Sequence, residues 1–271
     1  MSASSRRPAE AWGRIRLLLI LAAAVLVVVV VLVAGLVLAG TYAITGAPQD
    51  GGSRSPQSIG EKLPAAPAGR DAIAAAPMLQ VDRQAALPTA PAAVAGPTMR
   101  IPPATGTGRA GIAAGFPHTP WGAVGQLAAI GTEVLQGMSI TYTNDVYHQW
   151  AMPGGVGPEW TMTRNVQAFL DAAQMGQETD RAISVAAIPA AGQVKGLDPP
   201  DWAVVCVLFE VRAMITVEAR IGYGYCERMQ WQNRRWMIAP GVPPAQAPST
   251  WPGSDLSIRA GWRTWVDPVP E

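Results

Sequence analysis

Few residues of this 271-residue chain have the types and spacing that catalysis requires. The two histidines, His118 and His148, have no Cys, Asp or Glu nearby at the spacing of a metal site. The sequence contains no H-E-x-x-H, G-x-S-x-G, C-x-x-C or P-loop motif. Acids that could act as general bases occur singly, at Glu133, Asp145, Asp171 and Glu210. We therefore predict a protein that is not an enzyme and holds no cofactor or metal ion.

A nucleotide-binding pattern occurs once, because residues 106–111 match G-x-G-x-x-G. Phosphate binding by this pattern requires a strand before it and a helix directly after it. Here two prolines, Pro102 and Pro103, precede the pattern, and no helix start follows before Thr119. The pattern therefore indicates a glycine-rich loop.

The two cysteines, Cys206 and Cys226, are candidates for a disulfide. Both lie C-terminal to the membrane anchor that is predicted below for residues 17–40. We assign that side of the anchor to the exterior of the cell, where disulfides persist. The alternative is a pair of buried free thiols, because directly opposed cysteines on adjacent strands make a geometrically demanding bridge.

The overall composition argues against nucleic acid as a direct partner. The formal net charge is only +1, with no basic field. Without the anchor and linker described below, about 160 residues remain, the size of one ordinary domain. The 28 Gly, 25 Pro and many Ala residues are typical of high-GC bacterial genes.

Residues 17–40 form an uncharged apolar stretch that predicts a transmembrane helix. At about 1.5 Å per residue such a helix measures roughly 36 Å, enough to cross a hydrocarbon core of about 30 Å. Four arginines precede it and no charge follows it before Asp50. The positive-inside rule therefore predicts a single-pass plasma-membrane protein with a cytoplasmic tail (1–16) and an extracytoplasmic C-terminal domain.

Residues 41–108 contain ten prolines and no sustained periodicity, which indicates an extended linker. Two short apolar pieces, at 78–81 and 99–101, are candidates for edge strands of the following domain. We predict an external domain at residues 109–271. The sequence does not fix its first residue more closely than within 70–115.

The domain begins with a helical half. Thr119 is a helix cap and Pro120 suits the first helical position, with an apolar stripe following over 121–138. Further helices are expected near 144–152 and 159–175. His118, before the first of these helices, is expected to serve in packing or capping.

The second half of the domain has the period of strands. We expect short strands at 183–189 and 193–197, long ones at 202–211 and 216–232, and a last one at 235–239. A hairpin of the two long strands would place Cys206 opposite Cys226. A short terminal helix, capped by Ser254, would carry Trp262 and Trp265 on one face, docked on the core or forming a candidate interface with Trp251.

About three helices followed by a curved antiparallel sheet resembles the α+β cystatin-like, or nuclear-transport-factor-two-like, fold. A single-pass protein with such an external domain resembles the TcpC-like, type IV secretion inner-membrane bridging proteins of conjugative elements. The segments GFPHTPWGAV and WPGSDLSIRAGWRTWV are similar to parts of actinobacterial proteins encoded with mobile elements. TcpC-like proteins usually carry two such domains, and this chain has length for one.

The resemblance implies a membrane scaffold subunit of a conjugative DNA-transfer machine that acts by protein–protein contacts. Its expected partners are other secretion and conjugation subunits and further copies of itself. Two alternatives remain: an accessory protein of an Mce-type lipid transporter, and an anchored cell-envelope binding module or enzyme. A pocket with a buried acid in the concave face of the sheet would favour the binding module or enzyme, and a flat apolar Trp-rich surface would favour a scaffold or transporter subunit.

Overall fold

The computed structural model describes residues 69–180, 182–214 and 217–267. The predicted cytoplasmic tail (1–16), the predicted transmembrane helix (17–40) and residues 41–68 of the predicted linker lie outside this part. Among the described helices, none has the length and apolar character needed to cross a membrane.

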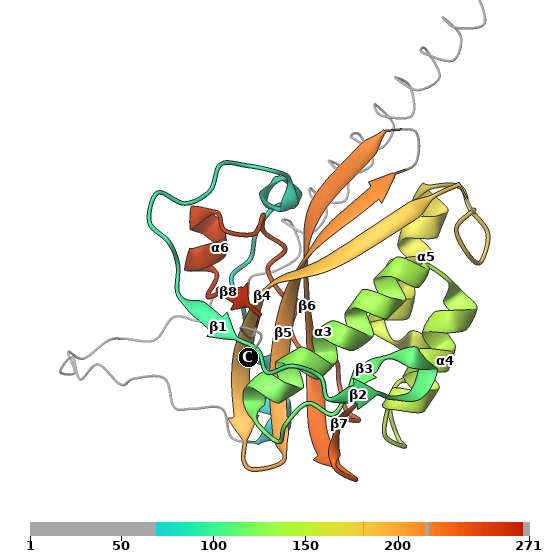
Figure 1. The fold of residues 1–271 in the computed structure, drawn as a ribbon, viewed down its shortest axis with the longest axis vertical. Helices are drawn as coiled ribbons and strands as arrows, with labels where there is room; N and C mark the ends of the chain where they lie inside the picture. The colour runs from blue at the N-terminus through green and yellow to red at the C-terminus, as the bar shows by residue number, and fades with distance from the viewer. Residues whose placement is uncertain (1–68, 181, 215–216, 268–271) are drawn as a thin grey trace, which may run out of the picture. The chain divides into compact units, whose positions relative to one another are not determined.

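A six-stranded sheet forms the centre of the domain (Figure 1). Its spatial order is β1-β8-β4-β5-β6-β7. The bounds are β1 Thr98–Arg100, β4 Ser184–Asp198, β5 Trp202–Met214, β6 Glu218–Gln232, β7 Arg235–Ile238 and β8 Arg263–Val266. Strands β4 to β7 are antiparallel neighbours, whereas β1 pairs parallel to β8 at one edge.

The hairpin of β5 and β6 has the register that the sequence predicts. Phe209 lies opposite Tyr223, and Cys206 lies opposite Cys226. Both strands alternate, so residues such as Val207 and Phe209 face one side of the sheet and Cys206 faces the other. Different helices and segments therefore pack on the two faces of the sheet.

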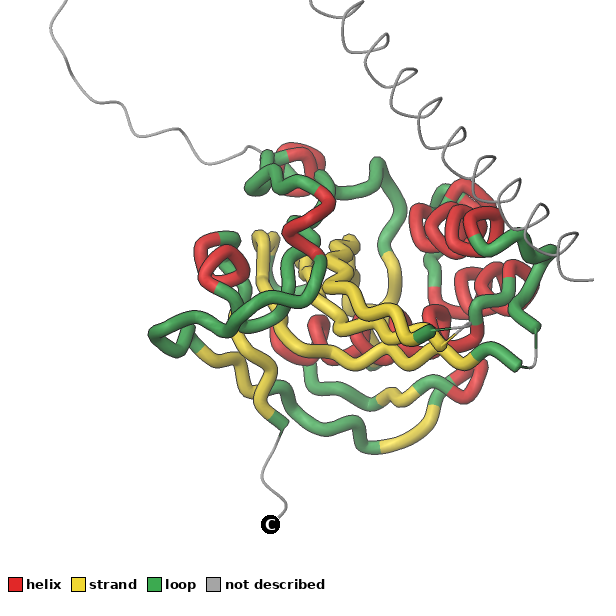
Figure 2. The backbone as a smooth tube through the Cα atoms, turned by 90° about the horizontal axis from the view of Figure 1, so that it is seen from above, coloured by secondary structure: helices red, strands yellow, loops and turns green. Residues whose placement is uncertain are grey.

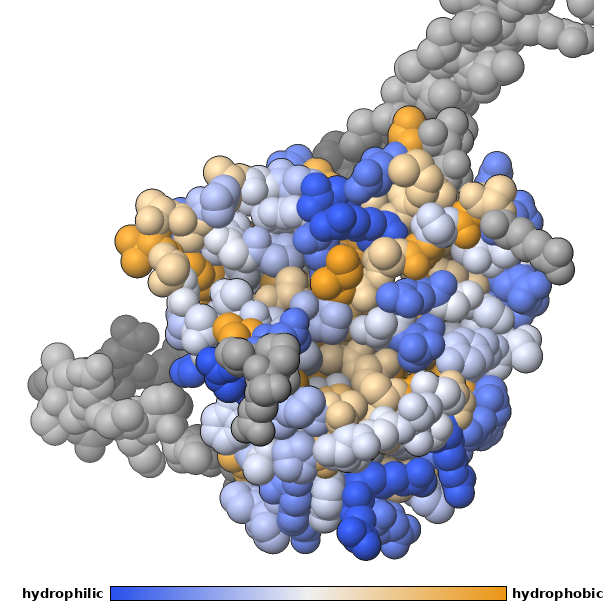
Figure 3. All heavy atoms as spheres, viewed as in Figure 1, coloured by the Kyte–Doolittle hydropathy of each residue, from blue (hydrophilic) through white to orange (hydrophobic). Residues whose placement is uncertain are grey.

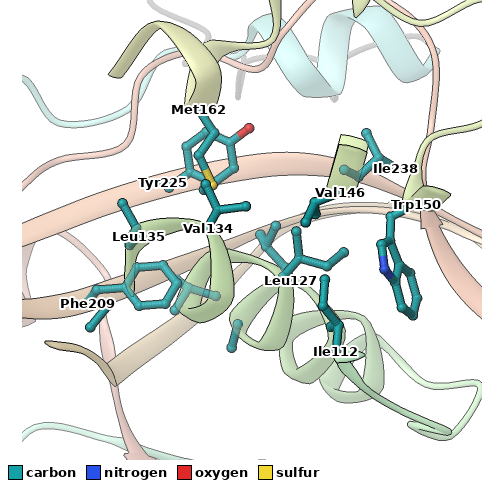
Figure 4. Packing of buried hydrophobic residues seen from close by; sticks show 14 of the residues in the cluster. Ile112, Leu127, Val134, Leu135, Val146, Trp150, Met162, Phe209, Tyr225 and Ile238 are labelled. Carbon is teal, nitrogen blue, oxygen red and sulfur yellow. The ribbon is translucent and has the colours of Figure 1, made fainter. Parts of the chain in front are cut away.

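The first face carries the three longer helices, α3 Pro120–Gly137, α4 Ile140–Trp150 and α5 Thr161–Ala172. As predicted, Thr119 caps α3, since its hydroxyl accepts the Gly122 N–H at 3.1 Å, and Pro120 takes the first position. Side chains from all three helices meet those of the sheet in one apolar core (Figure 4). Its labelled members include Leu127, Met162, Phe209 and Tyr225.

The second face is covered by shorter elements, so that helical segments lie on both sides of the strands (Figure 2). These are α2 Arg70–Ala75, α6 Asp255–Arg259 and the extended residues 243–250. The buried guanidinium of Arg228 on β6 binds Asp71 of α2 and lies over the ring of Trp202. This ion pair fixes α2 to the sheet.

Glycines on β6 allow residues 248–250 to lie directly against the strand. A Cβ atom at Gly222 would come within 1.9 Å of the Thr250 carbonyl oxygen, and one at Gly224 within 2.8 Å of the Pro248 carbonyl oxygen. Glycine at these two positions allows the second segment to approach the strand closely.

Remaining elements are short. They are the 3₁₀ helices η1 Arg83–Ala86, η2 Arg109–Gly111 and η3 Gly157–Glu159, and the hairpin of β2 Gly106–Thr107 with β3 Ala113–Ala114. The G-x-G-x-x-G segment forms β2 and η2, and no helix follows it before Pro120. It is the loop that the sequence predicted.

The expected nuclear-transport-factor-two-like fold, about three helices on a curved antiparallel sheet, is wrong. The described residues contain five α-helices and a large six-stranded mixed sheet, with layers on both faces. The sequence named 99–101, which overlaps β1, only as a candidate edge strand, and it did not predict β8, whose four residues show no clear period. It also treated α2 as part of a linker.

The packing of residues 70–108 bears on the start of the folded domain, which the sequence left open over residues 70–115. The apolar piece at 99–101 of the predicted linker overlaps β1, where Met99 lies opposite Trp265. Helix α2 packs on β4, where Ile73 lies against Gly196 and the Lys195 ammonium donates to the Ala74 carbonyl. Residues 70–108 therefore belong to the domain.

Candidate functional site

The two histidines do not form a catalytic pair. His118 Nε2 lies 2.9 Å from Asp201 Oδ1 and 3.0 Å from the Pro200 carbonyl oxygen, and its ring stacks on Trp231. His118 thus ties the start of α3 to the turn between β4 and β5, a packing role. His148 is exposed on α4. Among the described residues no group of three His, Cys, Asp or Glu side chains could hold a metal ion.

The cysteines form a disulfide in the structure. Cys206 and Cys226 are bonded across the β5–β6 pair on the second face of the sheet. Both are buried, and the Met78 sulfur lies 3.6 Å from the Cys226 sulfur. The bridge is enclosed by the segment that leads from α2.

The three tryptophans proposed as an interface do not form one surface. Trp262 is only 2% exposed and donates its indole N–H to the Pro248 carbonyl at 3.0 Å. It lies just before β8 and packs in the cluster of the second face, whereas the half-buried Trp265 packs against the first. Trp251 is half-buried beneath the guanidinium of Arg220. The assumption that a terminal helix carries Trp262 and Trp265 is wrong, because α6 ends at Arg259.

This placement predicts unequal effects on stability. Trp262→Phe should lower the free energy of unfolding by about 1–2 kcal/mol, because it removes a buried hydrogen bond and part of a packed ring. Trp265→Phe should cost less than about 0.5 kcal/mol, since the Trp265 N–H donates only to the exposed Asp267. Urea unfolding of the full chain measures both. Equal losses of unfolding free energy in the two variants would contradict the deeper burial of Trp262.

A buried carboxyl group, Glu227, lies on the first face of the sheet. Its Oε2 accepts the Trp160 indole N–H at 2.8 Å and the Tyr225 hydroxyl at 2.5 Å, and Oε1 accepts the Arg228 backbone N–H at 3.0 Å. Among the described acids it alone has a buried side chain. The sequence analysis missed it, although an acid at position 227 interrupts the apolar face of β6 between Tyr225 and Met229.

Burial controls the ionisation of this group. It raises the pKa of Glu227 above the ordinary value, against hydrogen bonds from Tyr225 and Trp160 that lower it. Burial also raises the pKa of Tyr223 and of Tyr225, and the nearby Glu227 carboxylate adds to both effects. The two tyrosines therefore keep their hydroxyl protons at neutral pH.

A cleft of about 520 Å³, here called the Tyr223 cleft, lies between α5, β6 and the extended segment after β7. Its lining comprises Thr161, Arg164 and Asn165 of α5, residues 223–226 of β6, residues 243–247 and Ser249. The Asn165 amide donates to the Tyr223 hydroxyl at 2.7 Å. Tyr225 joins the cleft to the buried network, because its hydroxyl binds Glu227.

Comparisons with known proteins identify no family. No protein-family model matches the chain, and no curated protein or solved structure matches it. The site therefore has to be judged by its own chemistry. Glu227 has three donors around it and does not line the cleft. The arrangement suits binding of a small polar molecule, with Glu227 holding Tyr225 and Trp160 in place.

Proposed function

We propose that this chain is a membrane-anchored binding module of the cell envelope, whose outer domain binds a ligand in the Tyr223 cleft. The observation that carries this proposal is the cleft itself, backed by the buried Glu227 network. Clefts of roughly 300–1,000 Å³ with a few fixed polar groups are the usual form of small-molecule sites.

Two further features support the cell-envelope part of this proposal. The disulfide between Cys206 and Cys226 suits an oxidising compartment outside the cytoplasm. The apolar stretch at 17–40 and the arginines before it favour an anchor with the C-terminal domain outside. No catalytic role is proposed for the domain.

In-cell photocrosslinking tests the proposal. A benzophenone amino acid at Gln246, an exposed residue that lines the cleft, should crosslink to a non-protein component of the envelope. The matched control carries the same group at Val242, which is 70% exposed on the same segment but outside the cleft lining. This position should not crosslink to a non-protein component. Equal crosslinking at both positions, or crosslinks from Gln246 only to proteins, would argue against a ligand cleft.

A second candidate is the scaffold subunit of a conjugative, type IV secretion-like machine, acting through contacts with other subunits and copies of itself. Trp121 and Leu197, which are 47% and 42% exposed, border a notch of about 370 Å³ at the edge of β4. Exposed aromatic and aliphatic side chains of this kind suit protein contacts. On the face seen in Figure 3, hydrophobic side chains are otherwise scattered among hydrophilic ones.

The same crosslinker at Leu197 separates the two candidates. A scaffold predicts crosslinks from position 197 to identified membrane subunits of the conjugation machinery, and none from position 246 to envelope material. The binding module predicts the opposite pattern.

A further inference from the structure

Strand β6 has an open edge beside the Tyr223 cleft. Among the described residues, no strand pairs with residues 218–227 on the side of β6 that faces away from β5. In an antiparallel sheet, a residue directs its N–H and C=O groups toward the same neighbour, and consecutive residues alternate. The Gly224 N–H donates to Ser249 Oγ, and the Arg228 carbonyl accepts the Ala239 N–H. Even-numbered residues of β6 therefore direct their main-chain groups away from β5.

Five main-chain groups on this edge have no hydrogen-bond partner within the part of the chain that the structure describes. They are the N–H and C=O groups of Gly222 and of Cys226, and the C=O group of Gly224. All three residues are buried, and each lines the Tyr223 cleft or the cleft beside it. Because buried main-chain groups are nearly always paired, a partner with both donors and acceptors is expected in these clefts.

The segment after β7 explains why this edge stays open. The segment lines the Tyr223 cleft but forms no strand pair with β6 among the described residues. The three prolines within residues 243–248 have no N–H group to donate. The Ala245 N–H donates to the Ala74 carbonyl instead. The sequence of the segment therefore lets it border the edge without occupying the hydrogen-bonding groups of β6.

The space beside the edge has the dimensions of one extended chain. A second cleft of about 330 Å³, here called the Leu79 cleft, adjoins the Tyr223 cleft and shares Tyr223 and Gln246 with it. At about 3.4 Å per residue, β6 rises roughly 14 Å from Gly222 to Cys226, which matches about four residues of a paired strand. Helix α5 lines one side of the Tyr223 cleft and the proline-rich segment lines another. This arrangement favours a single chain over the edge of a second sheet.

Charged side chains of both signs line the two clefts. Arg164 lines the Tyr223 cleft, and Asp82 and Arg83 line the Leu79 cleft. The amides of Asn165 and Gln246 add neutral donors and acceptors to the Tyr223 cleft. A free peptide carries an ammonium group at one end and a carboxylate at the other, so it can pair with charges of both signs.

We infer that the two clefts bind a short peptide of about four residues, which extends along β6 and forms main-chain hydrogen bonds with its open edge. This inference rests on the proposed function, because it names the class of ligand for the Tyr223 cleft. The peptide is free or attached to the envelope and is not a segment of a folded protein. Each of its amides supplies one donor and one acceptor, as the groups of Gly222 and Cys226 require. The pairing forms on either side of the Gly224 N–H, which Ser249 already holds.

Calorimetric titration of the full chain in a neutral detergent tests this inference. The probes are three tetrapeptides: Ala-Ala-Ala-Ala, Val-Thr-Val-Thr and Ala-Glu-Lys-Ala. At least one should bind, and amide hydrogen exchange at Gly222 and Cys226 should slow when it does. N-methylation of the second and fourth amides of that peptide, or of the third alone, removes donors of opposite direction. One of the two methylated forms should bind about tenfold more weakly and the other should bind nearly as well.

Two variants of the chain complete the test. Gln246→Trp should abolish peptide binding by filling the cleft, and Val242→Trp, on the same segment but outside both linings, should leave it unchanged. The inference is overturned if no probe binds, if exchange at Gly222 and Cys226 is unaffected, if both methylated forms bind equally well, or if binding survives Gln246→Trp. Crosslinking from Gln246 to envelope material without peptide binding would reject the peptide and leave the binding module standing.

Discussion

Glu227→Ala is expected to destabilise the domain by about 3–5 kcal/mol, the largest effect of any single substitution proposed here. The substitution leaves the Trp160 N–H, the Tyr225 hydroxyl and the Arg228 N–H without their acceptor in a buried site. Each unsatisfied donor costs about 1–3 kcal/mol, and the gain from no longer burying a carboxyl group offsets part of the total. Urea unfolding of the full chain, followed by tryptophan fluorescence, measures the change.

Glu159→Ala is the matched control for this substitution. The Glu159 side chain is 77% exposed and its nearest cation, Arg164, is 3.8 Å away. Its replacement should change the free energy of unfolding by no more than about 0.5 kcal/mol. Similar losses for the two variants would mean that Glu227 is not buried in the folded protein.

The raised pKa of Glu227 also predicts a pH dependence with a definite sign. Between the ordinary pKa of 4.5 and the raised folded value, the folded protein holds a proton that the unfolded chain has lost. The stability contributed by the protonated form is therefore fully present below pH 4.5 and is lost as the pH rises through the folded pKa. The Glu227→Gln variant cannot ionise at this position, so its free energy of unfolding should not fall in this way as the pH rises. A stability difference between the two proteins that stays constant from pH 4 to pH 8 would contradict it.

The sequence predicted the parts of the fold that depend on local chemistry. The cap at Thr119 and the proline after it determine the start of α3, and the alternation of β5 and β6 determines their register. Both are properties of neighbouring residues. The β4 strand was predicted as two pieces because Pro189 and Gly192 interrupt its pattern, although it runs from Ser184 to Asp198 with register shifts after Pro189 and Val194.

The missed parts depend on contacts between distant residues. Strands β1 and β8 are more than 160 positions apart, and β8 lies between β1 and β4 in the sheet. Helix α2 has six residues, too few for a stable isolated helix, and is held by the pairing of Asp71 with Arg228. No period within residues 69–108 signals such contacts.

The candidate site was missed for a related reason. Its residues come from α5, from β6 and from the proline-rich segment after β7. The one local signal was Glu227, an acid in the apolar half of an alternating strand. Asn165 and Tyr223 meet across 58 positions, so no spacing rule connects them.

Removing the disulfide should produce the second large effect. The double variant Cys206→Ala, Cys226→Ala is expected to lose about 3 kcal/mol of stability, because the bridge closes a loop of about 20 residues in the unfolded chain. Two buried sulfur atoms are also lost from the second face of the sheet. Urea unfolding of the oxidised full chain and of the double variant measures the difference.

Reduction of the wild-type protein separates the covalent constraint from the loss of buried volume. A reductant should lower the stability of the wild-type chain by most of the same amount and should leave the double variant unchanged. If the unreduced chain, once unfolded, is alkylated at Cys206 and Cys226, the bridge is absent. That result would also remove the support that the disulfide lends to an extracytoplasmic domain. It would not affect the argument for the Tyr223 cleft, because that argument depends on α5, β6 and the segment after β7.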